Sequence, residues 1–249
     1  MGILGLAALV WTVSIVQAPP AAKSGDFAAE YKSLEREFGA AQEAYYEPYA
    51  KAKSDEEREK IVLDPAKEPG KLFAARFEDL AKRAKGTETG ARSLLWVASN
   101  LREPGSESVS NAIDVLTTEY IDSPVLADLA RWLPQGTSSI GPERAQDVLE
   151  LLAEKPKLPE VRAAAVFSLA SIRYDEGKNA EAVELFRKLK KEYGSTPAAA
   201  QAEGYLFEIE HLQIGMAAPD FSAIDESGQP WKLSEYKGKV VVIDFWGFW

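Results

Sequence analysis

The spacing of the apolar residues is the feature that most constrains the fold of this chain. Between residues 26 and 213 they recur at helical intervals, and strand-like alternation is nearly absent. Steps of three and four residues place one such set on a single helix face: Phe73, Phe77, Leu80 and Ala84. Turn formers such as Asp64-Pro65 and Glu103-Pro104-Gly105 separate these sets. The pattern predicts a mostly α region at 26–213, built from short antiparallel helical hairpins in a repeat-like series.

The clearest hairpin runs from Val161 to Tyr193. We expect its first helix to bury Val161, Ala165, Leu169 and Ile172, and its second to bury Ala182, Phe186, Leu189 and Tyr193. Residues 161–196 resemble one tetratricopeptide repeat, and the matching positions are Leu169, Ala170, Gly177, Ala182 and Phe186. Such repeats need neighbours to bury their faces, so we expect the preceding helices to complete the stack. The region is then either a surface for a protein partner or a spacer whose aromatic residues are only core.

Composition excludes several classes of function. The formal net charge is −10 and basic residues do not alternate with aromatic ones, which argues against a nucleic-acid groove. There is no cysteine, so these residues hold no disulfide, no thiolate nucleophile and no cysteine-based zinc site. With His211 as the single histidine, we expect no metal site and no Ser/His/Asp triad. His211 is expected near a helix C-terminus, as a partner of the helix dipole or a packed surface residue rather than a metal ligand.

The first residues differ in kind from the rest. Ile3 to Val16 are continuously apolar or small, a run shorter than the ~20 residues of a membrane-spanning helix. Small residues at Val16 and Ala18 have the spacing that a signal peptidase recognises. No Lys or Arg precedes the run and Pro19 follows it, which leaves an uncleaved anchor or a wrongly chosen start codon open. We predict that 1–22 is a signal peptide or membrane anchor and that the protein is exported to the periplasm or cell envelope, with residues 3–16 as a possible tether to the inner membrane.

After Gln213 the pattern changes. Asp225 to Gly228 form a turn cluster between two short extended segments, and Ser234 to Lys239 suggest a turn or one helical turn capped by Ser234. Val240 to Trp246 are β-branched or aromatic without polar alternation except at one position, Asp244. Such a run is typical of a central strand that helices cover on both faces.

Four motifs in this tail resemble the opening of a redoxin domain of the thioredoxin fold, in the TlpA-like, AhpC/TSA-related group. The motifs are Gly215 to Phe221, Asp225 with Gly228, Leu233 to Val240, and Asp244 to Trp249. The resemblance implies that 214–249 is the N-terminal part of an α/β thioredoxin-like domain, cut just before its active site. In that group a Cys-x-x-Cys pair follows, and its nucleophilic cysteine is expected directly after Trp249. The 249 residues alone are then expected to be inactive.

Three residues are supporting candidates for the site by this resemblance: Asp244, Trp246 and Trp249. A carboxylate buried in an apolar strand has a raised pKa, and the resemblance implies that Asp244 lies beneath the cysteine pair and assists proton transfer. The alternative is that Asp244 simply meets water. We expect no cofactor and no metal; the partners would be protein dithiols and disulfides, with a further protein partner of the helical region left open.

The sequence therefore favours the N-terminal part of an exported thiol-disulfide oxidoreductase acting in cell redox homeostasis. A helical-repeat interaction module with a degenerate redoxin tail is the alternative of a different class. A peroxiredoxin-type antioxidant is a third possibility, if residues beyond Trp249 hold a peroxidatic cysteine. The Phe-Trp-x-x-Trp pattern at Phe245 to Trp249, which includes Trp246 and Trp249, favours disulfide exchange over peroxide reduction.

Overall fold

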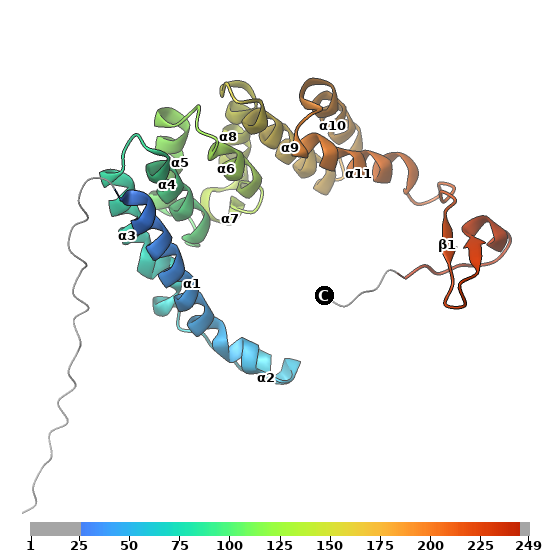
Figure 1. Cartoon of the computed structure of the whole chain (residues 1–249), viewed down its shortest axis with the longest axis horizontal. Helices are drawn as coiled ribbons and strands as arrows, with labels where there is room; N and C mark the ends of the chain where they lie inside the picture. The colour runs from blue at the N-terminus through green and yellow to red at the C-terminus, as the bar shows by residue number, and fades with distance from the viewer. Residues whose placement is uncertain (1–25, 245–249) are drawn as a thin grey trace, which may run out of the picture.

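The computed structural model describes residues 26–244 and is predominantly helical (Figure 1). Its helices are α1 Phe27–Lys51, α2 Asp55–Glu59, α3 Pro69–Arg83, α4 Glu88–Asn100, α5 Glu107–Glu119, α6 Leu126–Trp132, α7 Thr137–Ile140, α8 Pro142–Glu154, α9 Pro159–Asp175, α10 Asn179–Tyr193 and α11 Pro197–His211. Short 3₁₀ turns occur at η1 Pro65–Lys67 and η2 Leu233–Tyr236, and two strands at β1 Ser222–Ile224 and β2 Pro230–Lys232. The predicted fold class is confirmed: a mostly α chain followed by a small sheet consistent with an incomplete thioredoxin-like start.

The helices form a row in which neighbours in space are mostly neighbours in sequence. α3 packs on α4, α4 on α5, α8 on α9, α9 on α10 and α10 on α11. Helix α6 contacts both α4 and α9, and so links the earlier helices to the later ones. Figure 1 shows this row curving from α1 to α11, with the β1–β2 hairpin beyond the end of α11. Short connections between antiparallel helices account for the arrangement.

Local sequence explains where most helices begin. The side chains of Asp26, Thr87 and Thr196 accept hydrogen bonds from backbone N–H groups three residues further on, which satisfies donors that the first turn leaves free. Pro142 and Pro197 occupy first-turn positions, where the missing N–H of proline costs nothing. Helices α8 and α11 accordingly begin at these two prolines.

The larger of two apolar clusters joins α1, α3 to α6, α8 and α9. At its centre the Phe77 ring stacks on Trp96 with a centroid distance of 3.8 Å, and Phe38 meets Trp96 edge-on at 4.8 Å. Phe77 is fully buried and Trp96 is 5% exposed. Burial of each such aromatic side chain contributes about 1.5–3 kcal/mol, so this contact is a main attachment of α1 and α3 to α4.

Helix α9 is buried on two faces, which differs from the single apolar face predicted for it. Val161 and Ala165 lie in the first cluster as expected, whereas Leu169 and Ile172 are only half-buried against it. The opposite face of α9 enters a second cluster with α10 and α11; its members include Ala163, Val166, Ala170, Phe186 and Leu189. The cause is the position of α9, which packs on α6 and α8 on one side and on α10 and α11 on the other.

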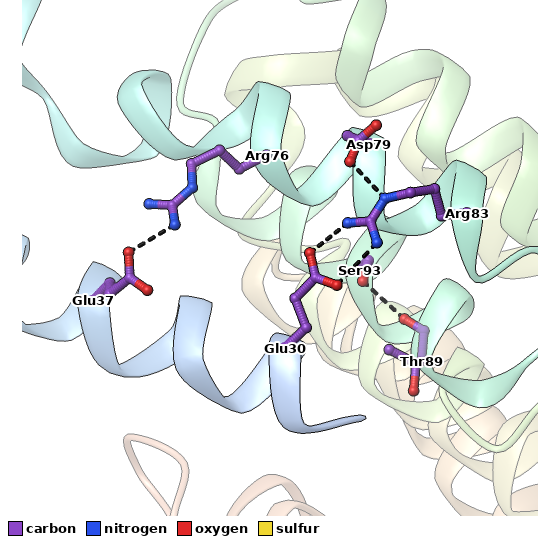
Figure 2. Close-up of polar contacts among 7 residues, drawn as sticks. All are labelled: Glu30, Glu37, Arg76, Asp79, Arg83, Thr89 and Ser93. Carbon is purple, nitrogen blue, oxygen red and sulfur yellow. Dashed lines mark hydrogen bonds and ion pairs between the residues drawn. The ribbon is translucent and has the colours of Figure 1, made fainter. Parts of the chain in front are cut away.

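Ion pairs hold α1 against α3. Arg83 binds both carboxylate oxygens of Glu30, and its Nε lies 2.7 Å from Asp79 Oδ2 (Figure 2). Further along the same pair of helices, Arg76 lies 2.7 Å from Glu37. The hydrogen bonds from Glu30 and Asp79 raise the pKa of the Arg83 guanidinium. Because the Arg83 and Glu30 side chains are 33% and 27% exposed, the pair is partly shielded from water and outweighs an ordinary surface ion pair.

The predicted strand at Val240 to Trp246 is not formed over its described part. Residues 240–244 have no strand conformation, and Val240 and Val242 are 98% and 89% exposed. A central strand is stable only with a partner on each edge and a covering layer on each face. In the described range the sole sheet is the antiparallel β1–β2 pair, with Ala223 opposite Trp231, and it offers neither. Trp246, the last residue of the predicted strand, lies outside the described residues.

Within residues 26–244, none of the helices combines the length and the apolar character that crossing a membrane requires. The predicted signal peptide or anchor at 1–22 lies outside the described residues.

Candidate functional site

The redoxin-like tail contains a hairpin built by short-range hydrogen bonds. Its turn is organised by Asp225, whose Oδ1 accepts hydrogen bonds from Ser227 N at 2.9 Å and Gln229 N at 2.8 Å. Gly228 has a φ of +79°, a conformation that glycine adopts without a steric penalty. The predicted turn between two short extended segments is therefore confirmed.

Asp220 fixes the start of this hairpin to its end. Ser234 donates from its backbone N to Asp220 Oδ1 at 2.8 Å and from its Oγ to Asp220 Oδ2 at 2.9 Å. These hydrogen bonds hold the pKa of the Asp220 carboxyl below its usual value, because they favour the charged form. The prediction that Ser234 caps a helical turn is wrong: η2 is present, but Ser234 makes no cap and is itself held by Asp220.

Aromatic side chains cover one side of the hairpin. The Trp231 ring meets Phe221 edge-on at 5.5 Å and Tyr236 at 5.7 Å between centroids, and Lys239 Nζ lies 5.6 Å from the Tyr236 ring centroid. The cluster is small, and Phe221 and Tyr236 are still 37% and 41% exposed. These contacts order the segment but present no nucleophile and no general base.

Of the predicted site residues, only Asp244 lies within the part of the chain that the structure describes. Asp244 is exposed, at the end of the segment that forms no strand, so the burial on which its proton-transfer role depends is not present here. Trp246 and Trp249 lie outside the described residues. No sequence position holds a cysteine. The described part of the tail, residues 214–244, is thus an ordered hairpin followed by an exposed segment.

Within residues 26–244, no group of three or more His, Cys, Asp or Glu side chains is arranged to hold a metal ion. His211 is the last residue of α11, as predicted, and its ring lies 5.0 Å from that of Phe207. Both side chains face outward.

The helical region contains a cleft that the sequence did not predict. It lies between α3 and α5 over α4 and has a volume of about 290 Å³. Its lining is apolar in depth and charged at the rim, and it comprises Glu78, Ala81, Lys82, Lys85, Leu94, Ser108, Asn111, Ala112, Val115, Glu119 and Tyr120. The small residues Ala81 and Ala112 were the available sequence indication, but only their positions on two separate helices reveal it.

A second cleft of about 280 Å³ lies where the loop after α6 meets α9 and α11. Phe167 and Ser171 of α9 line it together with Gln135 and Gln201. The Ser171 hydroxyl is buried there without a hydrogen-bond partner. Part of this cleft is formed by α9, the first helix of the hairpin predicted as tetratricopeptide-like.

Comparison with known proteins gives short local matches. No family model and no solved structure matches the chain. The thiol-disulfide oxidoreductases ResA of Bacillus thuringiensis subsp. konkukian and of Bacillus anthracis are each 40% identical over 47 residues, 19% of this chain and 27% of the relative. ResA of Geobacillus kaustophilus is 47% identical over 45 residues, 18% of this chain and 26% of the relative.

The chain thus spans about a quarter of the length of these curated relatives. The matches are 40–47% identical over 45–47 residues, and the relatives are named thiol-disulfide oxidoreductases. Together they support a thioredoxin-like redoxin.

Proposed function

We propose that this chain supplies the N-terminal part of an exported thiol-disulfide oxidoreductase of the thioredoxin-like redoxin class. The observation that supports this most is the 40–47% local identity to proteins named thiol-disulfide oxidoreductases. Helices α1 to α11 would then precede the redoxin segment, and the segment at 1–22 would direct the protein across or onto a membrane. Its substrates would be dithiols and disulfides of client proteins.

Chemistry decides what the 249 residues can do alone. Thiol-disulfide exchange begins with attack of a thiolate on a disulfide sulfur, and the pKa of that thiol must be low enough for the thiolate to form. None of the 249 residues is cysteine. By the redoxin resemblance we propose that a Cys-x-x-Cys directly follows Trp249, and we expect residues 1–249 alone to show no exchange activity.

Within this proposal Asp244 acts as a proton relay. When the strand that includes Asp244 is covered, its carboxylate is removed from water and can exchange a proton with a neighbouring thiol. Trp246 and Trp249 would flank the same site. In the exposed state seen here Asp244 meets water, so the role requires the completed domain.

The test compares two proteins in an insulin-disulfide reduction assay with dithiothreitol as electron donor. One is the chain of Met1 to Trp249, and the other extends it by the residues encoded next in the gene. We expect only the extended protein to accelerate reduction above the dithiothreitol background, and serine at its first cysteine to abolish the effect. Codons after Trp249 that specify no cysteine pair would refute the proposal.

A helical interaction module with a degenerate redoxin tail is the second candidate. It is favoured by the two clefts between helices, which lie away from the hairpin and need no thiol to bind a partner. A stop codon directly after Trp249 in intact genomic sequence would support this function and exclude the first. The gene sequence directly after Trp249 thus distinguishes the two candidate functions.

A further inference from the structure

The cleft between α3 and α5 is a consequence of how three helices pack. Both α3 and α5 lie against α4, and they pack on it in preference to each other. The space between them is therefore open above Leu94 of α4. Helix α1 does not close it, because α1 is bound to the face of α3 that bears Arg76 and Arg83, whereas Glu78 and Lys82 line the cleft.

Small side chains give the cleft its depth. Ala81 and Ala112 are 6% and 3% exposed and form its base, where a larger side chain would fill the gap. Leu94 and Val115 are half-buried and complete the apolar wall. Protein interiors are normally close-packed. The apolar gap of about 290 Å³ between these helices is therefore space that a group of another molecule can fill.

The rim has no preference for either sign of charge. Two acidic and two basic side chains surround the opening, and one pair neutralises itself, since Lys85 Nζ lies 2.9 Å from Glu119 Oε1. Such a rim favours a neutral occupant over an anion or a cation. Ser108 and Asn111 add a hydroxyl and a carboxamide, which match the N–H and C=O groups of a peptide backbone.

We propose that this cleft binds one large apolar side chain of a protein segment, with the backbone of that segment hydrogen-bonded to Ser108 and Asn111. At about 290 Å³ the cleft falls just below the roughly 300–1,000 Å³ of sites that hold whole cofactors or drug-sized ligands, and it has room for one large side chain. Aromatic side chains set into such pockets are typical anchors of protein–protein contacts. The inference does not depend on the redox function proposed above.

The first experiment titrates the full chain with N-acetyl-L-phenylalaninamide, a neutral capped residue, and follows methyl and amide resonances by NMR. We expect saturable shifts confined to the cleft, at Ala81, Leu94 and Ala112, with a dissociation constant of about 1 mM. N-acetylglycinamide, which lacks the side chain, should give none. The absence of saturable shifts at these residues, or equal shifts with the glycine compound, would overturn the proposal. Toluene binding as tightly as the capped residue would overturn its peptide component.

Variants then locate the site. Val115→Glu places a charge on the apolar wall and should weaken binding at least about tenfold. Val183→Glu, at a half-buried valine of α10 outside the cleft, is the matched control and should leave binding unchanged. Asn111→Ala alters only an exposed rim residue, so it should preserve the fold while weakening binding about threefold. Undiminished binding in both cleft variants would contradict the assignment.

Discussion

At the scale of single residues, Asp220 is the group on which the order of the tail depends most. It joins two segments that are fourteen residues apart through both of its carboxylate oxygens. The hairpin between them has no large core, since Phe221 is 37% exposed and Ile224 is 73% exposed. Polar contacts to a charged acceptor therefore provide a larger share of the local stability here than in the helical region.

This dependence predicts how the hairpin responds to acid. The pKa of Asp220 is lower in the folded hairpin than in the unfolded chain, so its contribution is fully present above the unfolded value of about 3.9. The contribution is lost as the pH falls through the lower, folded value. We expect the Ser234 amide resonance to stay constant down to about pH 5 and then to titrate with a midpoint below 3.9, the ordinary aspartate value.

Asp220→Asn removes the charge and should abolish this titration of Ser234. Asp147→Asn, at an exposed carboxylate of α8, provides the control and should leave the Ser234 titration as it is. A midpoint at or above the ordinary aspartate pKa in the unaltered protein would show that Asp220 is not held in its charged form by Ser234.

At the scale of elements, the sequence predicted what depends on local periodicity. The buried residues of α3 follow the spacing of Phe77, Leu80 and Ala84, because a helix has a fixed repeat. The second buried face of α9 was not predicted, since it depends on helices packed on either side of it. Ser234 was predicted to cap the adjacent helical turn, whereas its hydrogen-bond partner is Asp220, fourteen residues earlier in the sequence.

The candidate site follows the same division. The turn at Asp225 was predictable because its hydrogen bonds span only two and four residues. The strand at Val240 to Trp246 was inferred from composition, and over its described part, residues 240–244, it is not formed because strand formation requires partners that the described residues do not provide. The cleft over Leu94 combines residues of three helices, and no pattern within one helix indicates it.

Two helical glycines give a prediction about close packing between elements. A Cβ at Gly90 in α4 would lie 2.5 Å from the Ala84 carbonyl oxygen and 2.8 Å from the Tyr120 hydroxyl. We expect Gly90→Ala to lower the free energy of unfolding by about 1–3 kcal/mol, because the backbone of the preceding turn must move. Urea unfolding monitored by circular dichroism measures the change.

Gly204 of α11 is the matched control for this substitution. No heavy atom lies within 4 Å of a Cβ built there, so alanine meets no obstacle. Gly204→Ala should raise the free energy of unfolding by about 0.5–1 kcal/mol, since alanine loses less backbone entropy in a helix. Equal effects at the two glycines would indicate that the α4 turn is looser than the structure shows.

At the scale of the whole molecule, the chain divides into a large helical region and a small tail. The first apolar cluster has no member beyond α9, and the last member of the second is Ile209 of α11. Gln213 donates a hydrogen bond to the Glu208 carbonyl of α11. Among the described residues after Met216, the hydrogen bonds join one residue of the tail to another. The helical region therefore has its own core, and its stability should owe little to the hairpin.

Removal of residues 214–249 tests this independence. We expect the thermal midpoint of the helical signal to change by less than about 2 °C, because a shift of that size corresponds to under about 1 kcal/mol in a domain of this length.

The truncated protein should also be monodisperse at concentrations where the full chain associates, since exposed apolar segments such as Val240 to Ile243 promote association. A second truncation that removes only 240–249 separates the tail's last segment from the hairpin. If the midpoint falls by more than about 5 °C when 214–249 is removed, the helical region relies on contacts with the tail. If removal of 240–249 alone abolishes association while the midpoint stays constant, that last segment is what makes the full chain associate.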